Sequence, residues 1–405
     1  MHHRTFGCHR RHFLKLTAFA SVALPSLPSW AATSLVPERN RRSDAKVAIV
    51  PCRTYQREEI KAALGRSFDL LGGLGRLVRQ KTVTIKINLT GTNFLNYLGR
   101  PVGETYMTHG VTALVLTGLM FQAGARRVRF VESTNSRSEL ATSLEYAGWD
   151  VKGIRSLGLV EFENTRNLGF GKQYATLKVP SGGAMFSSLD LNHSYSETDV
   201  LVSLCKLKNH ITVGVTLSMK NLFGITPNSL YSGATGHEDA TDGRFPIHGP
   251  DKDPGKPLPG DLRLPGLKGK FADVPRDPGY RVPRTIVDIC AARPIDLAII
   301  DGITAMEGGE GPWCEEANPV KVTTPGVIIA GTNPVSTDAV ATAVMGYPDP
   351  RALRGTNPFK YSDNHILLAE QAGLGLADLS AIEVLGQPIK DSVCKYRMRL
   401  ENPQA

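Results

Sequence analysis

The sequence predicts an α/β fold, with a mainly parallel sheet that carries helices on both faces and with a long insertion rich in Pro and Gly. Short, almost continuous apolar runs alternate with segments of helical periodicity, which is the pattern of a parallel sheet buried on both faces. Residues 228–284 interrupt this alternation with closely spaced Pro and Gly. A chain of 405 residues, 41% hydrophobic and 21% charged, suffices for one large α/β domain or two smaller ones.

The strands are expected at apolar runs rich in β-branched residues, and the helices between them. In chain order the expected strands are residues 46–52, 82–93, 126–133, 199–208, 295–302 and 325–333. The expected helices are residues 111–125, 138–149 and 336–346, the last capped by Ser336 or Thr337 and ended by Gly346. We assign residues 45–390 to the α/β domain. A loop as long as 228–284 is usually functional or disordered, so it either covers a site or is a surface excursion.

The first 32 residues have the pattern of a bacterial twin-arginine export signal. The pair Arg10-Arg11 precedes an apolar stretch over residues 16–27, which is shorter than the roughly 20 residues of a membrane-spanning helix. Small residues before position 32 suit cleavage after Ala31 or Ala32. We therefore expect a periplasmic or otherwise exported protein that uses the twin-arginine export machinery. That route carries folded proteins and often serves proteins with an inserted cofactor, which hints at a bound metal or organic group.

Removal of this segment lowers the net charge. It holds four of the 47 Lys and Arg residues and none of the 38 Asp and Glu residues, so the formal charge falls from +9 to +5. A charge of +5 on a chain of this length does not indicate a nucleic-acid partner. No second apolar segment is long enough to predict a membrane span in the mature chain.

Five cysteines remain after the signal, and their spacing argues against a metal cluster. They are scattered and contain no C-x-x-C pair: Cys52, Cys205, Cys290, Cys314 and Cys394. We therefore expect no ferredoxin-type iron–sulfur cluster and no zinc ribbon. A disulfide would be possible in the periplasm, but the sequence does not pair these residues.

The stretch LCKLKNHITVGVTLSMKNLFGITP, residues 204–227, concentrates cations beside apolar residues. Alternate side chains of a strand share a face, so Lys206, Lys208 and His210 are expected to point the same way. A helix is expected from near Thr212, with Lys220 and Asn221 on it. Free N–H groups at a helix start, next to lysines, predict an anion site.

Polar residues also follow the other expected strands. Lys86 and Asn88 are expected to share a face at the end of one strand. Glu132 and Asp301 lie at the ends of two other expected strands, and Asp338 lies in the first turn of an expected helix. Ligands of parallel α/β sheets bind at the carboxyl ends of the strands, so these side chains could converge on one cleft. For an isolated acid such as Glu132 or Asp301, ordinary solvent exposure explains the residue equally well.

We assign roles to these candidates by their chemistry. His210, Lys220 and Glu132 are the candidate catalytic residues. The candidate substrate-binding residues are Lys86, Asn88, Lys206, Lys208, Asn221 and His109, although a lone His before a helix is more often a cap or a packing residue. The candidate metal ligands are the carboxylates Asp301, Glu307 and Asp338, the first two in the Gly-rich segment 301–313.

Four stretches resemble a family known as the domain of unknown function 362. They are TIKINLTG, LCKLKNHITVGVTLSMKNLFGI, DGITAMEGGEGP and AGTNPVSTDAVATAVMG, and the resemblance covers about residues 46–389. The resemblance implies the fold and the site more than a reaction. Some members of that family carry an added ferredoxin-like cysteine block, which this chain lacks.

A fainter similarity links the chain to the nickel-pincer lactate racemase family. His210 and Lys220 are ten residues apart, with Gly214 and Gly224 near them, as that family has a histidine, a cofactor-bearing lysine and glycines. The similarity implies an organometallic cofactor at Lys220. TLSM stands before Lys220, however, where the racemases have a Gly-Gly pair.

Two classes of function follow from these residues. The first is an exported enzyme that acts on a small carboxylate or phosphate by acid–base chemistry at the Lys/His cluster, with the reaction unassigned and with a divalent metal or an organometallic cofactor left open. The alternative is a non-catalytic periplasmic protein that binds or matures a metal, a cofactor or an anionic ligand. A third interpretation treats the lysines as a solvated edge without function.

Overall fold

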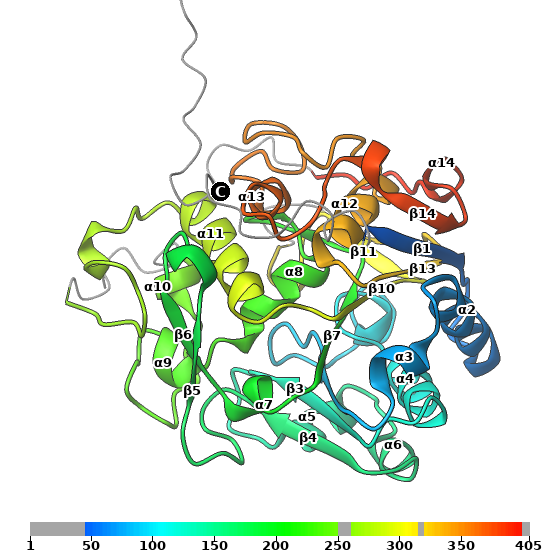
Figure 1. Cartoon of the computed structure of the whole chain (residues 1–405), viewed down its shortest axis with the longest axis horizontal. Coiled ribbons are helices and arrows are strands. Elements are labelled where there is room, and N and C mark those ends of the chain that lie inside the picture. Colours follow the sequence, from blue (N-terminus) through cyan, green and yellow to red (C-terminus); the bar gives the residue numbers. More distant parts are fainter. Residues whose placement is uncertain (1–44, 250–260, 315–319, 399–405) are drawn as a thin grey trace, which may run out of the picture.

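An eight-stranded sheet forms the centre of the computed structural model, which describes residues 45–249, 261–314 and 320–398 (Figure 1). Across the sheet the strands are β14 (Glu383–Gly386), β1 (Lys46–Pro51), β13 (Val327–Gly331), β10 (Leu297–Gly302), β7 (Val200–Lys206), β2 (Thr82–Lys86), β3 (Arg127–Glu132) and β4 (Val160–Asn164). All adjacent pairs are parallel except the two that involve β13, which is antiparallel to β1 and to β10. The prediction of a mainly parallel sheet is confirmed.

Helices cover both faces of this sheet, as the near-continuous apolar strands predicted (Figure 1). One face carries α2 (Arg57–Leu70), α3 (Leu74–Val78), α4 (Gly110–Gln122), α5 (Leu140–Tyr146) and α6 (Val151–Arg155). The other face carries α8 (Leu217–Asn221), α11 (Pro278–Ala292), α12 (Pro334–Val344) and α13 (His365–Gln371).

Alternation along a single strand shows how the two cores are divided. In β10, Leu297 and Ile299 belong to the core beneath α2–α6, whereas Ala298 and Ile300 belong to the core beneath α8 and α11–α13. This two-residue period places successive side chains on opposite faces. The strand is therefore apolar at nearly every position because both of its faces are buried.

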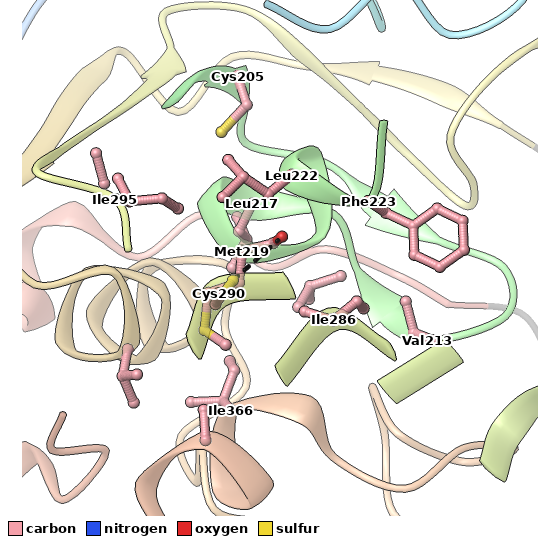
Figure 2. Packing of buried hydrophobic residues seen from close by; sticks show 14 of the residues in the cluster. Cys205, Val213, Leu217, Met219, Leu222, Phe223, Ile286, Cys290, Ile295 and Ile366 are labelled. Carbon is pink, nitrogen blue, oxygen red and sulfur yellow. Dashed lines mark hydrogen bonds between the residues drawn. The ribbon is translucent and has the colours of Figure 1, made fainter. Parts of the chain in front are cut away.

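The short helix α8 lies inside the second core. Leu217, Met219 and Leu222 of this region pack near Ile286 and Cys290 of α11 and near Ile366 of α13 (Figure 2). The Sγ atom of Cys290 lies 3.9 Å from the carbonyl oxygen of Met219, which accepts its hydrogen bond. Apolar packing against α11 and α13 therefore helps to fix α8, which carries Lys220.

The remaining elements are short. Three two-stranded sheets pair β5 (Ala175–Lys178) with β6 (Ser188–Leu191), β8 (Asn209–His210) with β9 (Gly214–Val215), and β11 (Ala305–Glu307) with β12 (Lys321–Thr323). The short helices are α7 (His193–Ser196), α9 (Asn228–Tyr231), α10 (Phe245–His248) and α14 (Ile389–Ser392). The 3₁₀ turns are η2 (Val102–Glu104), η3 (Pro180–Gly182), η4 (Leu222–Ile225), η5 (Phe271–Asp273), η6 (Pro312–Cys314) and η7 (Leu379–Ala381).

Two expected elements near the strand ends were wrong in their bounds. The expected strand 82–93 stops at Lys86, because the backbone N–H groups of Asn88 and Leu89 turn away to bind Thr108 and Glu132. The helix expected from Thr212 begins only at Leu217, because residues 209–215 form the β8–β9 hairpin. The first difference comes from tertiary hydrogen bonds and the second from a local hairpin, and sequence periodicity reports neither.

The cap of α12 was also misplaced. The side chain of Asn333, rather than Ser336 or Thr337, accepts the hydrogen bond of an N-cap, from the backbone N–H of Ser336 at 3.1 Å. Pro334 then occupies the first helical position, where its missing N–H costs nothing. Gly346 follows the helix end with φ of 89°, as predicted for a glycine that stops a helix.

The insertion 228–284 is partly ordered into short elements. It contains α9, α10, η5 and the start of α11, and its residues 250–260 lie outside the described part of the chain. The export signal expected over residues 1–32 also lies outside the described residues. Among the residues that the structure describes, none of the helices has the length and apolar character needed to cross a membrane.

Candidate functional site

A cavity of about 760 Å³ lies at the carboxyl ends of β2 and β3, as parallel-sheet geometry predicts. Four parts of the chain line it: the ends of β2 and β3 with the segments that follow them, the stretch 210–224, residues 243–249 of the insertion, and the turn with Glu310 and Trp313. Its charged lining residues, apart from histidines, are Lys86, Glu132, Lys220, Arg244 and Glu310. Cations therefore exceed acids in the lining.

A buried ion pair forms one wall. The Nζ atom of Lys86 lies 2.8 Å from Oε1 of Glu132, and both side chains are almost fully buried. Lys86 also donates to the Ile87 carbonyl at 2.6 Å and to Oδ1 of Asn221 at 3.3 Å. Burial lowers the pKa of Lys86, and the Glu132 carboxylate opposes that shift. Gly224 permits this pair, since a Cβ there would lie 2.8 Å from the Lys86 Nζ.

Asn221 holds α8 against the end of β2. Its Nδ2 donates to the Lys86 carbonyl at 3.1 Å and to the Ser203 hydroxyl at 3.0 Å. Its Oδ1 accepts from Asn88 Nδ2 at 3.1 Å as well as from Lys86. The amide is therefore saturated, and Asn221 and Asn88 stabilise the cavity wall more than they offer free polar atoms.

Of the cations that line the cavity, Lys220 is the one without a polar partner among the described residues. Among the described residues its Nζ makes no hydrogen bond and no ion pair, and it lies 4.6 Å from the centre of the Phe223 ring. The side chain is half-buried and lines the cavity. Burial lowers the pKa of Lys220 to about 7; the Glu310 carboxylate opposes this shift, and the charges of Lys208, Arg244 and Lys86 add to it.

The backbone that presents Lys220 is strained and anchored. Leu217, at the start of α8, has φ of 47°, in the left-handed region that costs a non-glycine residue roughly 1–2 kcal/mol. Asp338 of α12 accepts hydrogen bonds from the N–H of Ser218 at 2.9 Å, from its hydroxyl at 2.6 Å and from the N–H of Met219 at 2.9 Å. The carboxylate thus satisfies the first N–H groups of α8 and holds the helix in place.

Three histidines interact electrostatically with Lys220, namely His210, His248 and His365. Burial is the main cause that lowers the pKa of each, and the Lys220 charge is the next. The pKa of His365 falls to about 3, and neither of its ring nitrogens has a hydrogen-bond partner among the described residues. All three imidazoles are therefore neutral at neutral pH.

His210 is oriented by its own hairpin. Its Nδ1 accepts from the backbone N–H of Thr212 at 3.1 Å, so the proton of the neutral ring sits on Nε2. That Nε2 lies 3.9 Å from Oε1 of Glu310, whose Oε2 accepts from the Ile211 N–H at 2.8 Å. His210 therefore offers an N–H donor at the cavity wall.

The insertion supplies two further cavity residues, Arg244 and His248. The Arg244 guanidinium donates to three carbonyl oxygens, those of Thr226, Ser133 and Gly224, at 2.6, 2.9 and 3.4 Å. No carboxylate of the described residues pairs with it within 4 Å, and burial lowers its pKa to about 10. Part of the segment that sequence analysis treated as either a cover or an excursion is therefore a cavity wall.

A second polar cluster, built from Lys206, Asp301, Tyr55 and His109, lies outside the cavity lining. The Lys206 Nζ donates to the Tyr55 hydroxyl at 2.6 Å and lies 3.3 Å from Asp301, and both charged side chains are fully buried. His109 stacks on Tyr55, with ring centroids 3.6 Å apart, and caps α4 by accepting from the Val111 N–H. Lys206 and His109, which were predicted to bind substrate, have internal partners in the structure.

Lys208 is also used internally. Its Nζ donates to the carbonyls of Tyr106 at 2.6 Å and Glu310 at 3.1 Å, and to the side chains of Asn88 at 3.0 Å and Thr90 at 3.2 Å. Burial lowers its pKa to about 8. The lysine thus ties the Glu310 turn to the end of β2 and is absent from the cavity lining.

The three predicted metal ligands are not brought together. Asp301 binds Lys206 and Tyr55, Asp338 anchors α8, and Glu307 accepts from the Arg397 N–H at 2.9 Å. Within the described residues no group of three His, Cys, Asp or Glu side chains is arranged to hold a metal ion. The geometry therefore gives these carboxylates structural partners.

The structure thus places six predicted site residues on the cavity: His210, Lys220, Glu132, Lys86, Asn88 and Asn221. It adds Arg244, His248, Glu310 and Trp313, which sequence analysis did not assign to the site. Glu310 lies in the Gly-rich segment 301–313, which the sequence analysis had singled out. Arg244 and His248, in contrast, lie in a segment without a regular pattern. Only the tertiary fold brings that segment to the strand ends.

The fold and the cavity define an α/β protein with a cation-rich pocket at the carboxyl edge of a mainly parallel sheet. The profile of the family described as domain of unknown function (DUF362) matches residues 83–343, so the chain belongs to that family. The Thylakoid-associated protein sll1697 of Synechocystis sp. is 25% identical over 310 residues, which cover 74% of this chain and 74% of that protein. The likeness to the nickel-pincer racemases stays a prediction from the sequence.

Proposed function

We propose that this protein is an exported enzyme that moves a proton on a small carboxylate or phosphate, with Lys220 as its acid–base group. The observation that supports this most directly is the half-buried Lys220 ammonium, which faces the cavity and has no polar partner among the described residues. Export is inferred from the twin-arginine pattern at Arg10-Arg11.

The anion would be held by the two lining cations that have no carboxylate partner among the described residues. Lys86 is neutralised by Glu132, which leaves Lys220 and Arg244 to attract a negative charge. A guanidinium also suits a carboxylate or phosphate through parallel N–H donors. The His210 Nε2–H would donate a further hydrogen bond to the bound ligand.

Lys220 is suited to acid–base work because its pKa of about 7 leaves both protonation states populated near neutral pH. The amine form would accept a proton from a carbon or oxygen atom next to the anionic group. The ammonium form would return it. This scheme assigns the reaction to proton transfer without naming the substrate.

Deuterium exchange tests this proposal without knowledge of the substrate. A panel of small carboxylates and phosphate esters is incubated with the purified protein in D₂O, and loss of C–H signal is followed by NMR. We expect exchange for a subset, and Lys220→Met should slow it by about 10²–10⁴-fold, the usual share of a general acid–base group. The matched control is Lys61→Met, on the exposed surface of α2, which should exchange at the normal rate.

The alternative is a non-catalytic protein that binds the same anion or carries a metal or cofactor. Lys220 and Arg244, which have no carboxylate partner among the described residues, would support anion binding in such a protein as well as in an enzyme. Calorimetry and intact-mass measurement on protein exported by its native host separate the two functions. Stoichiometric anion binding without exchange on any substrate would replace the enzyme by a binding protein. A mass excess that disappears in Lys220→Met would indicate an attached cofactor.

A further inference from the structure

We infer that the ligand is an amphipathic anion, in which the carboxylate or phosphate is joined to a planar aromatic or other apolar body. This inference rests on the proposed function, because it takes anion binding at Lys220 and Arg244 as given. It goes further by specifying the part of the ligand that those cations do not recognise.

The cavity lining changes character between its floor and its mouth. Lys86, Glu132 and Asn221 at the floor are at most 4% exposed. The more exposed lining residues include the apolar Ile211, Phe245 and Trp313, of which Trp313 is 44% exposed, beside the polar Thr90, Asn135 and Thr212. A ligand held by Lys220 and Arg244, which are themselves half-buried, therefore has these apolar side chains within the same cavity for its uncharged part.

Trp313 is held as a fixed surface at this mouth. Its Nε1 donates to Oε1 of Glu310 at 3.3 Å, and its ring meets Tyr106 edge to face at a centroid distance of 6.0 Å. The ring also lies against Gly91 and Gly311, where an added Cβ would approach to 3.0 and 2.2 Å. An oriented and partly exposed indole offers a face for an aromatic ring, which prefers offset-stacked or edge-to-face contact.

Size supports the same conclusion. Pockets of roughly 300–1,000 Å³ hold ligands of drug size, and this cavity measures about 760 Å³. An acid of two or three carbons would fill a minor part of it and would leave the aromatic wall uncovered. Phe223, which contacts both Lys220 and His248, continues that wall toward the cations.

Paired probes test the inference, each pair having the same anionic group with and without a phenyl ring: lactate and 3-phenyllactate, acetate and phenylacetate, phosphate and phenyl phosphate. Affinities are measured by calorimetry for the unaltered protein, Trp313→Leu, Trp313→Phe and Lys220→Met. We expect the phenyl member of at least one pair to bind tenfold or more tightly than its partner, about 1.4 kcal/mol. Trp313→Leu should remove most of this preference and Trp313→Phe should retain it.

The outcomes separate this inference from the proposed function. Equal affinity within every pair, or a phenyl preference that survives in Trp313→Leu, overturns the amphipathic ligand and leaves anion binding intact. No binding of any probe, or binding that Lys220→Met leaves unchanged, overturns the anion site and the inference with it. Circular dichroism of each variant confirms the fold, which we expect to persist because Trp313 is partly exposed.

Discussion

Lys206 and Lys220 come from one short stretch of sequence, yet they end in opposite environments. Lys206 is fully buried and pairs with Asp301 and Tyr55. Lys220 is half-buried beside the cavity, and none of the described residues gives it a polar partner. A run of cations thus contains both structural lysines and a chemically available one.

The contrast indicates that the hydrogen-bond partners of each cation, rather than the number of cations in a segment, locate the functional group. A buried ammonium needs acceptors, and Lys206 and Lys208 have found them within the protein. Arg244 falls between the two cases, since carbonyl oxygens bind it but no described carboxylate neutralises it. The cations that remain available to a ligand are those without a neutralising partner.

Removal of each lysine in turn should give the largest contrast. Lys206→Met leaves the Asp301 carboxylate buried without its cation, and breaking such a pair typically costs about 3–5 kcal/mol. Lys220→Met removes a half-buried charge that lacks a described partner, so the free energy of unfolding should stay unchanged or rise. Urea denaturation of both variants at pH 7 measures the difference.

The double variant Lys206→Met/Asp301→Asn is the control for this contrast. It removes both charges, so it should recover part of the stability that Lys206→Met alone loses. Equal destabilisation by Lys206→Met and Lys220→Met would contradict the distinction between the two environments.

A smaller effect is expected from loosening the helix that presents Lys220. Asp338→Asn keeps the shape of the side chain but loses acceptor capacity toward Ser218 and Met219, and an unsatisfied buried donor costs about 1–3 kcal/mol. Anion affinity should fall as well, because the strained start of α8 at Leu217 loses its anchor.

Asp69→Asn, on the exposed surface of α2, is the matched control and should leave both quantities unchanged. The two readouts are the urea unfolding free energy and the calorimetric affinity for 3-phenyllactate. Weakened stability with unaltered affinity would show that Asp338 supports the fold without positioning Lys220.

The sheet and part of the site could be predicted because their signals are local. Apolar runs without alternation identified strands buried on both faces, and polar residues at their ends identified Lys86, Asn88 and Glu132 at the cavity. The alternation of side chains along a strand predicted that Lys206 and Lys208 share a face. It could not reveal the hydrogen-bond acceptors that both lysines find inside the protein. Tyr55, the Tyr106 carbonyl and the Glu310 carbonyl come from distant segments, so no local pattern reveals them.

The insertion is a second part of the site that local sequence patterns could not predict. Arg244 and His248 stand in a segment without helical or strand periodicity, and Pro and Gly around them indicated only a loop. Their place on the cavity depends on contacts such as Arg244 with the Ser133 carbonyl, across a long separation in sequence. The role of Asp338 was equally hard to predict, because nothing near this carboxylate in the sequence indicates that its partner is the start of α8.

The sharpest distinction between the two lysines is in pH dependence. Lys220 has a pKa of about 7 in the native protein and an ordinary lysine pKa of about 10.4 when unfolded. Between these values the unfolded chain binds more protons, so this group makes the unfolding free energy rise as pH increases from 7 to 10. Anion affinity should do the reverse and fall above pH 7 by at most about tenfold per pH unit, because the ammonium loses its charge.

Measurement of both quantities from pH 6 to pH 10 checks the opposite signs. The Lys220→Met variant should bind 3-phenyllactate more weakly at pH 6, and its affinity should change less with pH across the titration of Lys220. Burial also lowers the pKa values of Lys86, Lys206 and Lys208. These lysines titrate in both proteins, so their contributions cancel when the two pH profiles are compared. Parallel pH profiles for the two proteins would show that Lys220 does not titrate near neutrality.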